Sequence, residues 1–247
     1  QEQDIELRTY LQDQQGHTVL SFSDKQKVSA RTTQLFDHTE SIQNPHLWYP
    51  IGCSGTPYLY TVLNKVYVNG KLADSQSEPF GIREITWDEN YCYVNAEKCI
   101  LRGFGSRNIY PGLGAAIPAA LQWQDIALIA QCGGNTLRVG HQPPFTEALK
   151  ACDAYGGLLI VNSGDGEWSL KNEPAKTYKR EYDREMLVAF RNHPSVVIWE
   201  SNNGLAYDGD KYLPSHTLSE VKAWDYIQPR LVLNRDGYPP EWDEKEP

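Results

Sequence analysis

The chain has 247 residues, 40% hydrophobic and 22% charged, which is the composition of a folded globular protein with one large core or two smaller ones. Its net charge of −9 argues against nucleic acid or an anionic membrane as a partner, and no apolar run approaches the length of a membrane span. The N-terminal sequence lacks the basic and apolar segments of a signal peptide. We therefore expect a cytosolic protein or one whose signal peptide has been removed, and favour a periplasmic or extracellular location.

Residues 1–90 predict an antiparallel β domain. Their β-rich runs lie at residues 4–10, 18–23, 58–68 and 82–87. The third run leads into Asn69–Gly70, a pair typical of a tight hairpin turn. Because the runs are short, separated by turn residues and without helical periodicity, they favour a small β-sandwich.

Five cysteines leave at least one thiol unpaired. Cys92 and Cys99 flank Asn95–Ala96 symmetrically, so a two-residue turn would place them opposite each other on paired strands. Both a disulfide and two free thiols are compatible with that arrangement. The spacing of cysteines and histidines does not indicate a zinc site, and the sequence predicts no metal and no cofactor.

From residue 91 onward, strands and helices alternate. Helical periodicity predicts helices at residues 118–132, 145–155, 175–191 and 218–224. Short apolar runs predict strands at residues 101–104, 135–139, 158–161, 196–199 and 231–233. These strands are too apolar for burial on one face only, so they indicate a parallel sheet covered by helices. A complete (β/α)8 barrel takes about 250 residues. Residues 91–247 therefore predict a partial barrel of five βα units.

Six sequence blocks, in the same order along the chain, resemble glycoside hydrolase family 2, the family of β-galactosidases, β-mannosidases and β-glucuronidases. They are PHLWYP at residues 45–50, PYLY at 57–60, Asp74 with FGIR at 80–83, LRG at 101–103, NTLRVGHQP at 135–143 and HPSVVIWESNNG at 193–204. The resemblance implies an immunoglobulin-like β-sandwich over residues 1–90, followed by the first part of a catalytic TIM barrel over residues 91–247. It also implies hydrolysis of terminal β-glycosides with retention of configuration, through a covalent glycosyl-enzyme.

The resemblance assigns contacts with the sugar to Arg138, His141 and Asn203. Arg138 alternates with apolar neighbours, which suggests that it points into the barrel mouth, although an ion pair that only holds the barrel together also fits. His141 follows the strand end, where it either binds a sugar hydroxyl or braces the following loop. Asn203 matches an asparagine that hydrogen-bonds the 2-position of the sugar. Asn202 and Trp199 are further candidates, and Trp199 is equally compatible with a core position.

The sequence departs from the family at the catalytic acid, because the position of the acid/base glutamate holds Gly204. Glu200 is the nearest carboxylate in sequence, so it is either a replacement acid or a residue with a pocket or structural role. The nucleophile of the family lies on the seventh barrel strand, which residues 91–247 do not reach. Retaining hydrolysis requires both carboxyl groups.

Two functions follow from these residues. One is a family 2-like β-glycosidase whose barrel is completed by further sequence or by another chain. The alternative is a non-catalytic carbohydrate-binding relative that has lost its acid. In both cases the expected partner is a β-linked sugar, as an oligosaccharide or the end of a polysaccharide.

Overall fold

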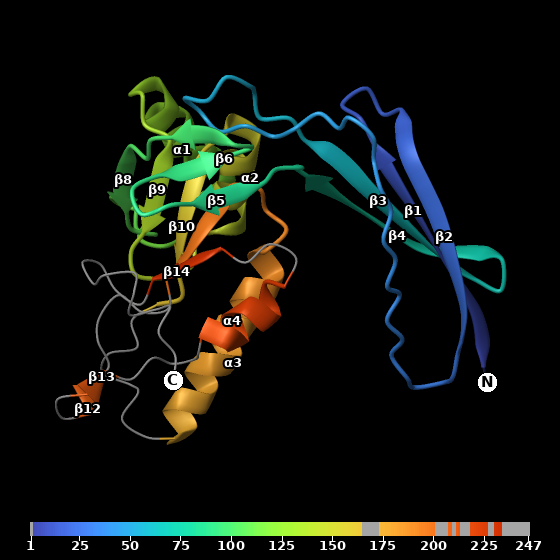
Figure 1. The fold of residues 1–247 in the computed structure, drawn as a ribbon. Coiled ribbons are helices and arrows are strands. Elements are labelled where there is room, and N and C mark those ends of the chain that lie inside the picture. Colours follow the sequence, from blue (N-terminus) through green and yellow to red (C-terminus); the bar gives the residue numbers. More distant parts are fainter. Residues whose placement is uncertain are drawn as a thin grey trace. The chain divides into compact units, whose positions relative to one another are not determined.

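Figure 1 shows the computed structural model of the chain, which describes residues 2–164, 173–200, 207–208, 211–212, 218–226 and 230–233. These residues form two compact units. The first unit contains the residues up to Leu47 together with Tyr58–Ile82, and the second contains Trp48–Pro57 together with the chain from Arg83 onward. The chain therefore enters the second unit at residues 48–57, returns to the first unit for residues 58–82, and then stays in the second unit.

The first unit is a four-stranded antiparallel sheet in the order β2-β1-β3-β4. Its strands are β1 (Gln3–Gln12), β2 (Thr18–Val28), β3 (Tyr60–Val68) and β4 (Lys71–Phe80). Asn69 and Gly70 form the predicted turn between β3 and β4, and both have a positive φ, 48° and 79°. Within the described residues of this unit, every strand belongs to this one sheet.

The two faces of this sheet differ in chemistry because side chains alternate along each strand. On one face Leu7 of β1 lies opposite Val66 of β3. On the other face the Arg8 guanidinium carbon is 4.2 Å from the centre of the Tyr67 ring. The polar and apolar alternation that predicted β structure thus corresponds to one apolar and one polar face.

The second unit contains a small antiparallel sheet formed by β5 (Ile85–Trp87), β6 (Cys92–Val94) and β7 (Glu97–Cys99). Asn95 and Ala96 make the two-residue turn between β6 and β7, with φ values of 52° and 63°. The register places Cys92 directly opposite Cys99, and both thiols are free. Of the two alternatives that the spacing allowed, the structure therefore has the free thiols.

A five-stranded parallel sheet forms the centre of the second unit (Figure 1). Its strands are β8 (Gly103–Ser106), β9 (Thr136–Val139), β10 (Leu158–Asn162), β11 (Val196–Glu200) and β14 (Leu231–Leu233), and they lie side by side in chain order. The helices that connect them are α1 (Ala119–Gln131), α2 (Thr146–Tyr155), α3 (Glu173–Phe190) and α4 (Leu218–Trp224). Two short strands, β12 (Tyr207–Asp208) and β13 (Lys211–Tyr212), pair between β11 and α4.

This order of strands and helices confirms the predicted partial barrel. The strand that differs most from the prediction is β8, which begins at Gly103 rather than at Leu101. Leu101 and Arg102 precede the sheet, and the backbone oxygen of Arg102 accepts hydrogen bonds from the backbone nitrogens of Asn135 and Thr136. These bonds connect the segment before β8 to the start of β9.

The helices cover one face of the parallel sheet with an apolar core. The strands contribute Leu137, Val139, Leu159, Val161, Trp199 and Val232 to this core. The helices contribute Ile126, Leu149, Cys152, Met186, Leu187 and Val221. Because successive side chains of a strand point to opposite faces, Arg138, Ile160 and Glu200 lie on the other face, which is the interior side of a barrel.

The segment Trp48–Pro57 belongs to the second unit by its contacts. Trp48 is fully buried, and its indole nitrogen donates a 2.8 Å hydrogen bond to the backbone oxygen of Asp153. The backbone nitrogen of Ile51 donates to the oxygen of Gly156, and the side chain of Asn135 donates to the oxygen of Ile51. The prediction placed the boundary at residue 90, where the sequence pattern changes. The contacts instead join residues 48–57 and 83–90 to the second unit.

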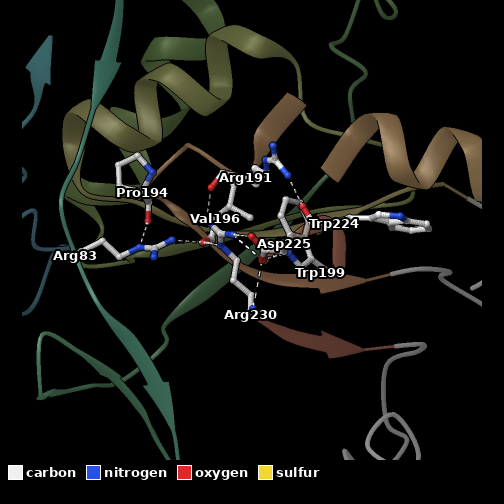
Figure 2. A network of polar contacts seen from close by, with 8 residues as sticks. All are labelled: Arg83, Arg191, Pro194, Val196, Trp199, Trp224, Asp225 and Arg230. Atoms are coloured by element: carbon white, nitrogen blue, oxygen red, sulfur yellow. Dashed lines mark hydrogen bonds and ion pairs between the residues drawn. The ribbon is translucent and has the colours of Figure 1, made fainter. Parts of the chain in front are cut away.

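Figure 2 shows how polar side chains hold the beginning of β11. Arg83 donates hydrogen bonds to the backbone oxygens of Pro194 and Val196, at 3.0 and 3.1 Å. Arg230, which directly precedes β14, donates to the same Val196 oxygen at 2.7 Å and pairs with Asp225 at 2.6 Å. Two arginines distant in sequence thus fix the amino-terminal end of β11.

Candidate active site

Arg138 and Glu200 form a two-pronged ion pair across the interior face of the parallel sheet. The Nε atom of Arg138 donates to Oε2 of Glu200 at 2.8 Å, and Nη2 donates to Oε1 at 2.6 Å. Arg138 is the third residue of β9, and Glu200 is the last residue of β11. Two parallel N–H···O bonds between a guanidinium and a carboxylate fix both the distance and the plane of the groups.

The burial of this pair is unequal. The Glu200 side chain is 1% exposed, whereas the Arg138 side chain is 21% exposed. A buried carboxylate is tolerated only when it is paired, and Arg138 supplies that pairing. The guanidinium is therefore the more accessible member of the pair.

Between these two strands, β10 ends in Asn162, which the sequence analysis did not select. Asn162 pairs in register with Glu200 and is fully buried. Its Oδ1 accepts a 2.6 Å hydrogen bond from the backbone nitrogen of Gly164. Its Nδ2 has no hydrogen-bond partner among the residues that the structure describes. A polar residue directly after the apolar run Leu158–Val161 was the signal that could have identified it.

The backbone after Asn162 is held by Lys179 of α3. The Nζ atom of Lys179 donates to the backbone oxygen and the hydroxyl of Ser163, at 2.8 and 2.7 Å, and to the oxygen of Gly164 at 3.3 Å. It also lies 3.1 Å from the carboxylate of Asp183, one helical turn further along α3. The first two residues beyond β10 are thus fixed to the helix that follows.

His141 lies beyond the carboxyl end of β9, in the connection to α2, and is partly buried. The same connection is tied to the loop after β8, because the side chain of Asn108 donates a 2.7 Å hydrogen bond to the backbone oxygen of Pro143. Asn108 is itself 8% exposed. The loops that follow β8 and β9 are therefore coupled next to the end of the strand that carries Arg138.

Trp199 lies on the opposite face of β11 from Glu200. Its indole is buried in the core under the helices and donates a 2.8 Å hydrogen bond to Asp225, as Figure 2 shows. The guanidinium of Arg230 lies 5.3 Å from the centre of its ring. Of the two positions considered for Trp199, this one is the core position. Two other predicted sugar contacts, Asn202 and Asn203, lie outside the described residues, as does Gly204.

Neither a metal-binding cluster nor a membrane-spanning helix occurs in the described part of the chain. No group of three or more histidine, cysteine, aspartate or glutamate side chains is arranged there to hold a metal ion. None of the helices in these segments combines the length and the apolar character needed to cross a membrane.

Comparisons with protein families identify the chain along most of its length. The family model described as "Glycosyl hydrolases family 2" matches residues 1–83. The model described as "Glycosyl hydrolases family 2, TIM barrel domain" matches residues 85–225, more than half of the chain. The chain belongs to glycoside hydrolase family 2. The resemblance carried by the six sequence blocks is thereby confirmed, together with an immunoglobulin-like β domain followed by part of a TIM barrel.

Individual relatives agree with this assignment. A β-glucuronidase of Formosa agariphila is 28% identical over 236 residues, which cover 94% of this chain and 23% of that protein. The β-galactosidase BoGH2A of Bacteroides ovatus is 26% identical over 208 residues, which cover 81% of this chain and 24% of that protein. A solved family 2 β-glucuronidase matches with a TM-score of 0.82 at 26% identity, covering 95% of this chain and 24% of the other. The chain thus spans about a quarter of the length of these relatives.

Proposed function

We propose that the protein is a β-glycosidase that hydrolyses a terminal β-glycoside with retention of configuration, and that this chain supplies part of its active site. The observation that carries the proposal is the ion pair between Arg138 and Glu200 on the interior face of the sheet. In TIM-barrel enzymes the chemistry takes place where the strands end, and Glu200 is the last residue of its strand. The family assignment supports the same reaction class.

Retaining hydrolysis uses two carboxyl groups about 5 Å apart, one as acid/base and one as nucleophile. Among the last residues of the five described parallel strands, Glu200 is the carboxylate. In this scheme the second carboxyl group comes from further βα units, supplied by additional sequence or by another chain. Within the described part of the chain, the edge strands β8 and β14 each pair with one strand, so further units could pair at either edge.

The pair suggests a division of roles. Both Glu200 oxygens accept hydrogen bonds from Arg138, which suits a carboxylate that orients the guanidinium against the sugar. A replacement acid would need one oxygen to leave Arg138 and carry a proton toward the leaving group. His141 and the two asparagines at residues 202 and 203 would then add hydrogen bonds to sugar hydroxyls. We infer that β-glucuronides and β-galactosides, named by the relatives, are the first substrate classes to test.

The test is hydrolysis of a panel of aryl β-glycosides by the full-length protein and its Arg138→Lys variant. Lysine keeps the charge but cannot donate two parallel bonds to a carboxylate, so kcat/KM should fall by about a hundredfold. The control is Lys150→Ala, which removes a partly exposed ion pair with Glu147 on α2 and should leave kcat/KM unchanged. Retention is read from the anomer that forms first.

Three outcomes separate the candidate functions. Turnover that falls in Arg138→Lys but not in Lys150→Ala supports the glycosidase. No turnover of any substrate by a folded protein that still binds sugar identifies the non-catalytic carbohydrate-binding relative instead. Turnover with inversion, or turnover unaffected by Arg138→Lys, contradicts the proposed mechanism.

A further inference from the structure

Asn162 has an amide group that the protein satisfies on one side only. The residue is fully buried at the end of β10, and its Oδ1 accepts a hydrogen bond from the backbone nitrogen of Gly164. Its Nδ2 has no partner among the described residues. A buried donor without an acceptor costs about 1–3 kcal/mol. Such groups are rare in native proteins, and each calls for an explanation.

The orientation of this amide is fixed. A rotation that exchanged Oδ1 and Nδ2 would place an NH2 group against the N–H of Gly164, so two donors would face each other. The backbone that carries this N–H cannot shift easily, because Lys179 holds the carbonyl oxygens of Ser163 and Gly164. The unpaired group is therefore the donor, and its position is set before any ligand arrives.

The register places Asn162 on the interior face. Ile160 lies opposite Arg138 in β9 and Ile198 in β11, and Asn162, two residues further along β10, lies opposite Glu200. The intervening Val161 belongs to the core under the helices. Asn162 therefore projects to the same side of the sheet as the Arg138–Glu200 pair and ends the strand that lies between them.

We propose that Asn162 is a sugar-binding residue, whose Nδ2 donates a hydrogen bond to an oxygen of the terminal sugar bound against Arg138 and Glu200. The inference rests on the proposed function and adds a residue to that site. No described residue accepts a hydrogen bond from this Nδ2, and an oxygen of a sugar bound beside the Arg138–Glu200 pair would supply that acceptor. A hydroxyl and a sugar carboxylate share this chemistry, and both are present in a uronic acid.

The expected effect is on recognition. A site built to hydrogen-bond a ligand oxygen discriminates against an analogue that lacks it, because the donor is then left unpaired. Asn162 should therefore contribute to affinity for one particular oxygen of the sugar and not for the others. A residue that merely supported the strand would influence all sugars equally.

Two substitutions separate the donor from the rest of the side chain. Asn162→Asp keeps the oxygen that accepts from Gly164 and removes the donor. Asn162→Ala removes both. The matched control is Asn135→Ala, because Asn135 is equally buried but its amide is satisfied by the backbone oxygens of Ile51 and Ile100. Loss of Asn135 should lower stability without changing the affinity of the folded protein for sugars.

The measurements use the full-length protein and two readouts. Calorimetric titration with deoxynojirimycin and with its uronic counterpart gives affinity independently of turnover. Kinetics with aryl β-glycosides that each lack one hydroxyl identify the oxygen involved. Both Asn162 variants should bind the better of the two inhibitors about tenfold to a hundredfold more weakly. The deficit in kcat/KM should disappear for the one deoxy substrate that lacks the contacted oxygen.

The inference is overturned if the variants bind as tightly as the wild type, or if the deficit has the same size for every deoxy substrate. These results are distinct from failure of the proposed function, in which the wild type turns over no glycoside. If such an inactive wild type still binds the inhibitors, the titrations alone decide the role of Asn162. A wild type that turns over no glycoside and binds neither inhibitor contradicts both proposals, whereas for an active wild type that binds neither inhibitor the deoxy substrates decide the role of Asn162. Circular dichroism establishes that each variant is folded before it is compared.

Discussion

The indole nitrogen of Trp48 donates a 2.8 Å hydrogen bond to the backbone oxygen of Asp153, a residue 105 positions further along the chain. Trp48 is fully buried, and the side chain of Asn95 donates to its backbone oxygen. A segment that precedes the last two strands of the first unit is thus built into the second. The packing of the second unit therefore depends in part on residues 48–57, which lie within the β-rich N-terminal part of the sequence.

Replacing Trp48 should destabilise the second unit. Trp48→Ala removes a buried aromatic side chain and leaves a cavity, so we expect a loss of about 3–5 kcal/mol of unfolding free energy. Trp48→Phe keeps most of the ring but leaves the Asp153 oxygen without its indole donor, at a cost of about 1–3 kcal/mol. Urea unfolding followed by circular dichroism measures both. Both variants lose the hydrogen bond to Asp153, so equal stability would show that packing of the aromatic ring adds nothing measurable to the free energy of unfolding.

Stability should depend far more on the buried pair of Arg230 and Asp225 than on a partly exposed pair. Asp225→Ala leaves the Arg230 guanidinium without its carboxylate and removes the acceptor of the Trp199 indole, which should cost about 3–5 kcal/mol. Lys150→Ala at the partly exposed pair with Glu147 should cost less than about 1 kcal/mol. Urea unfolding of the two variants tests this: if the m value is unchanged, the shift of the denaturant midpoint gives the loss of unfolding free energy. Similar losses would contradict the role assigned to burial.

Glu200→Gln separates the two roles of this carboxylate. If Glu200 orients Arg138, the substitution should lower kcat/KM by a similar factor for all aryl leaving groups, because one strong acceptor becomes a donor facing the guanidinium. If Glu200 is the acid, the loss should grow as the leaving group becomes less acidic, since activated leaving groups need little assistance. A plot of the activity ratio against leaving-group pKa decides between a flat and a sloping line. We expect the flat line.

The thiols of Cys53, which is partly buried, and of Cys92, which is buried, should react slowly with alkylating reagents. Burial raises the pKa of Cys53 to about 12 and that of Cys92 to about 12, so very little thiolate is present at pH 8. Cys132 is exposed and should be labelled first by iodoacetamide. Peptide mass spectrometry over a time course gives the order of reaction. Labelling of Cys92 ahead of Cys132 would mean that the small antiparallel sheet opens readily.

The attachment of residues 48–57 should weaken in acid. The hydroxyl and backbone nitrogen of Ser54 donate to Glu97, and these hydrogen bonds lower the pKa of the Glu97 carboxyl below its ordinary value of 4.5. Because the folded-state pKa is lowered, the contribution is complete above pH 4.5 and is lost as the pH falls through the lower value. The protection factor of the Ser54 amide, which corrects the observed exchange rate for the intrinsic slowing of exchange in acid, should therefore decrease below that pH. A Glu97→Gln variant should show less pH dependence.

Periodicity in the sequence predicted most of the local structure of both units but missed β4 (Lys71–Phe80), whose largely polar sequence is not a β-rich run. The Asn69–Gly70 and Asn95–Ala96 turns, the apolar strands and the helices between them occur where the pattern places them, within a few residues. These elements are determined by nearby residues, through turn conformations and through the alternation of apolar side chains. The boundary between the units could not be read in this way. It depends on contacts such as that between Trp48 and Asp153, which join distant parts of the chain.

The candidate site shows the same division. Alternation in β11 requires that Trp199 and Glu200 point to opposite faces, but it does not say which face carries the helices. Packing decides this, because the Trp199 indole reaches Asp225 beside α4, and Glu200 is left to meet Arg138. Asn162 becomes significant only through its register with Glu200 and the missing partner of its amide. The sequence by itself determined the family, the elements and the order of the strands, whereas the tertiary structure decided which polar groups meet, because such meetings depend on strand pairing across long sequence separations.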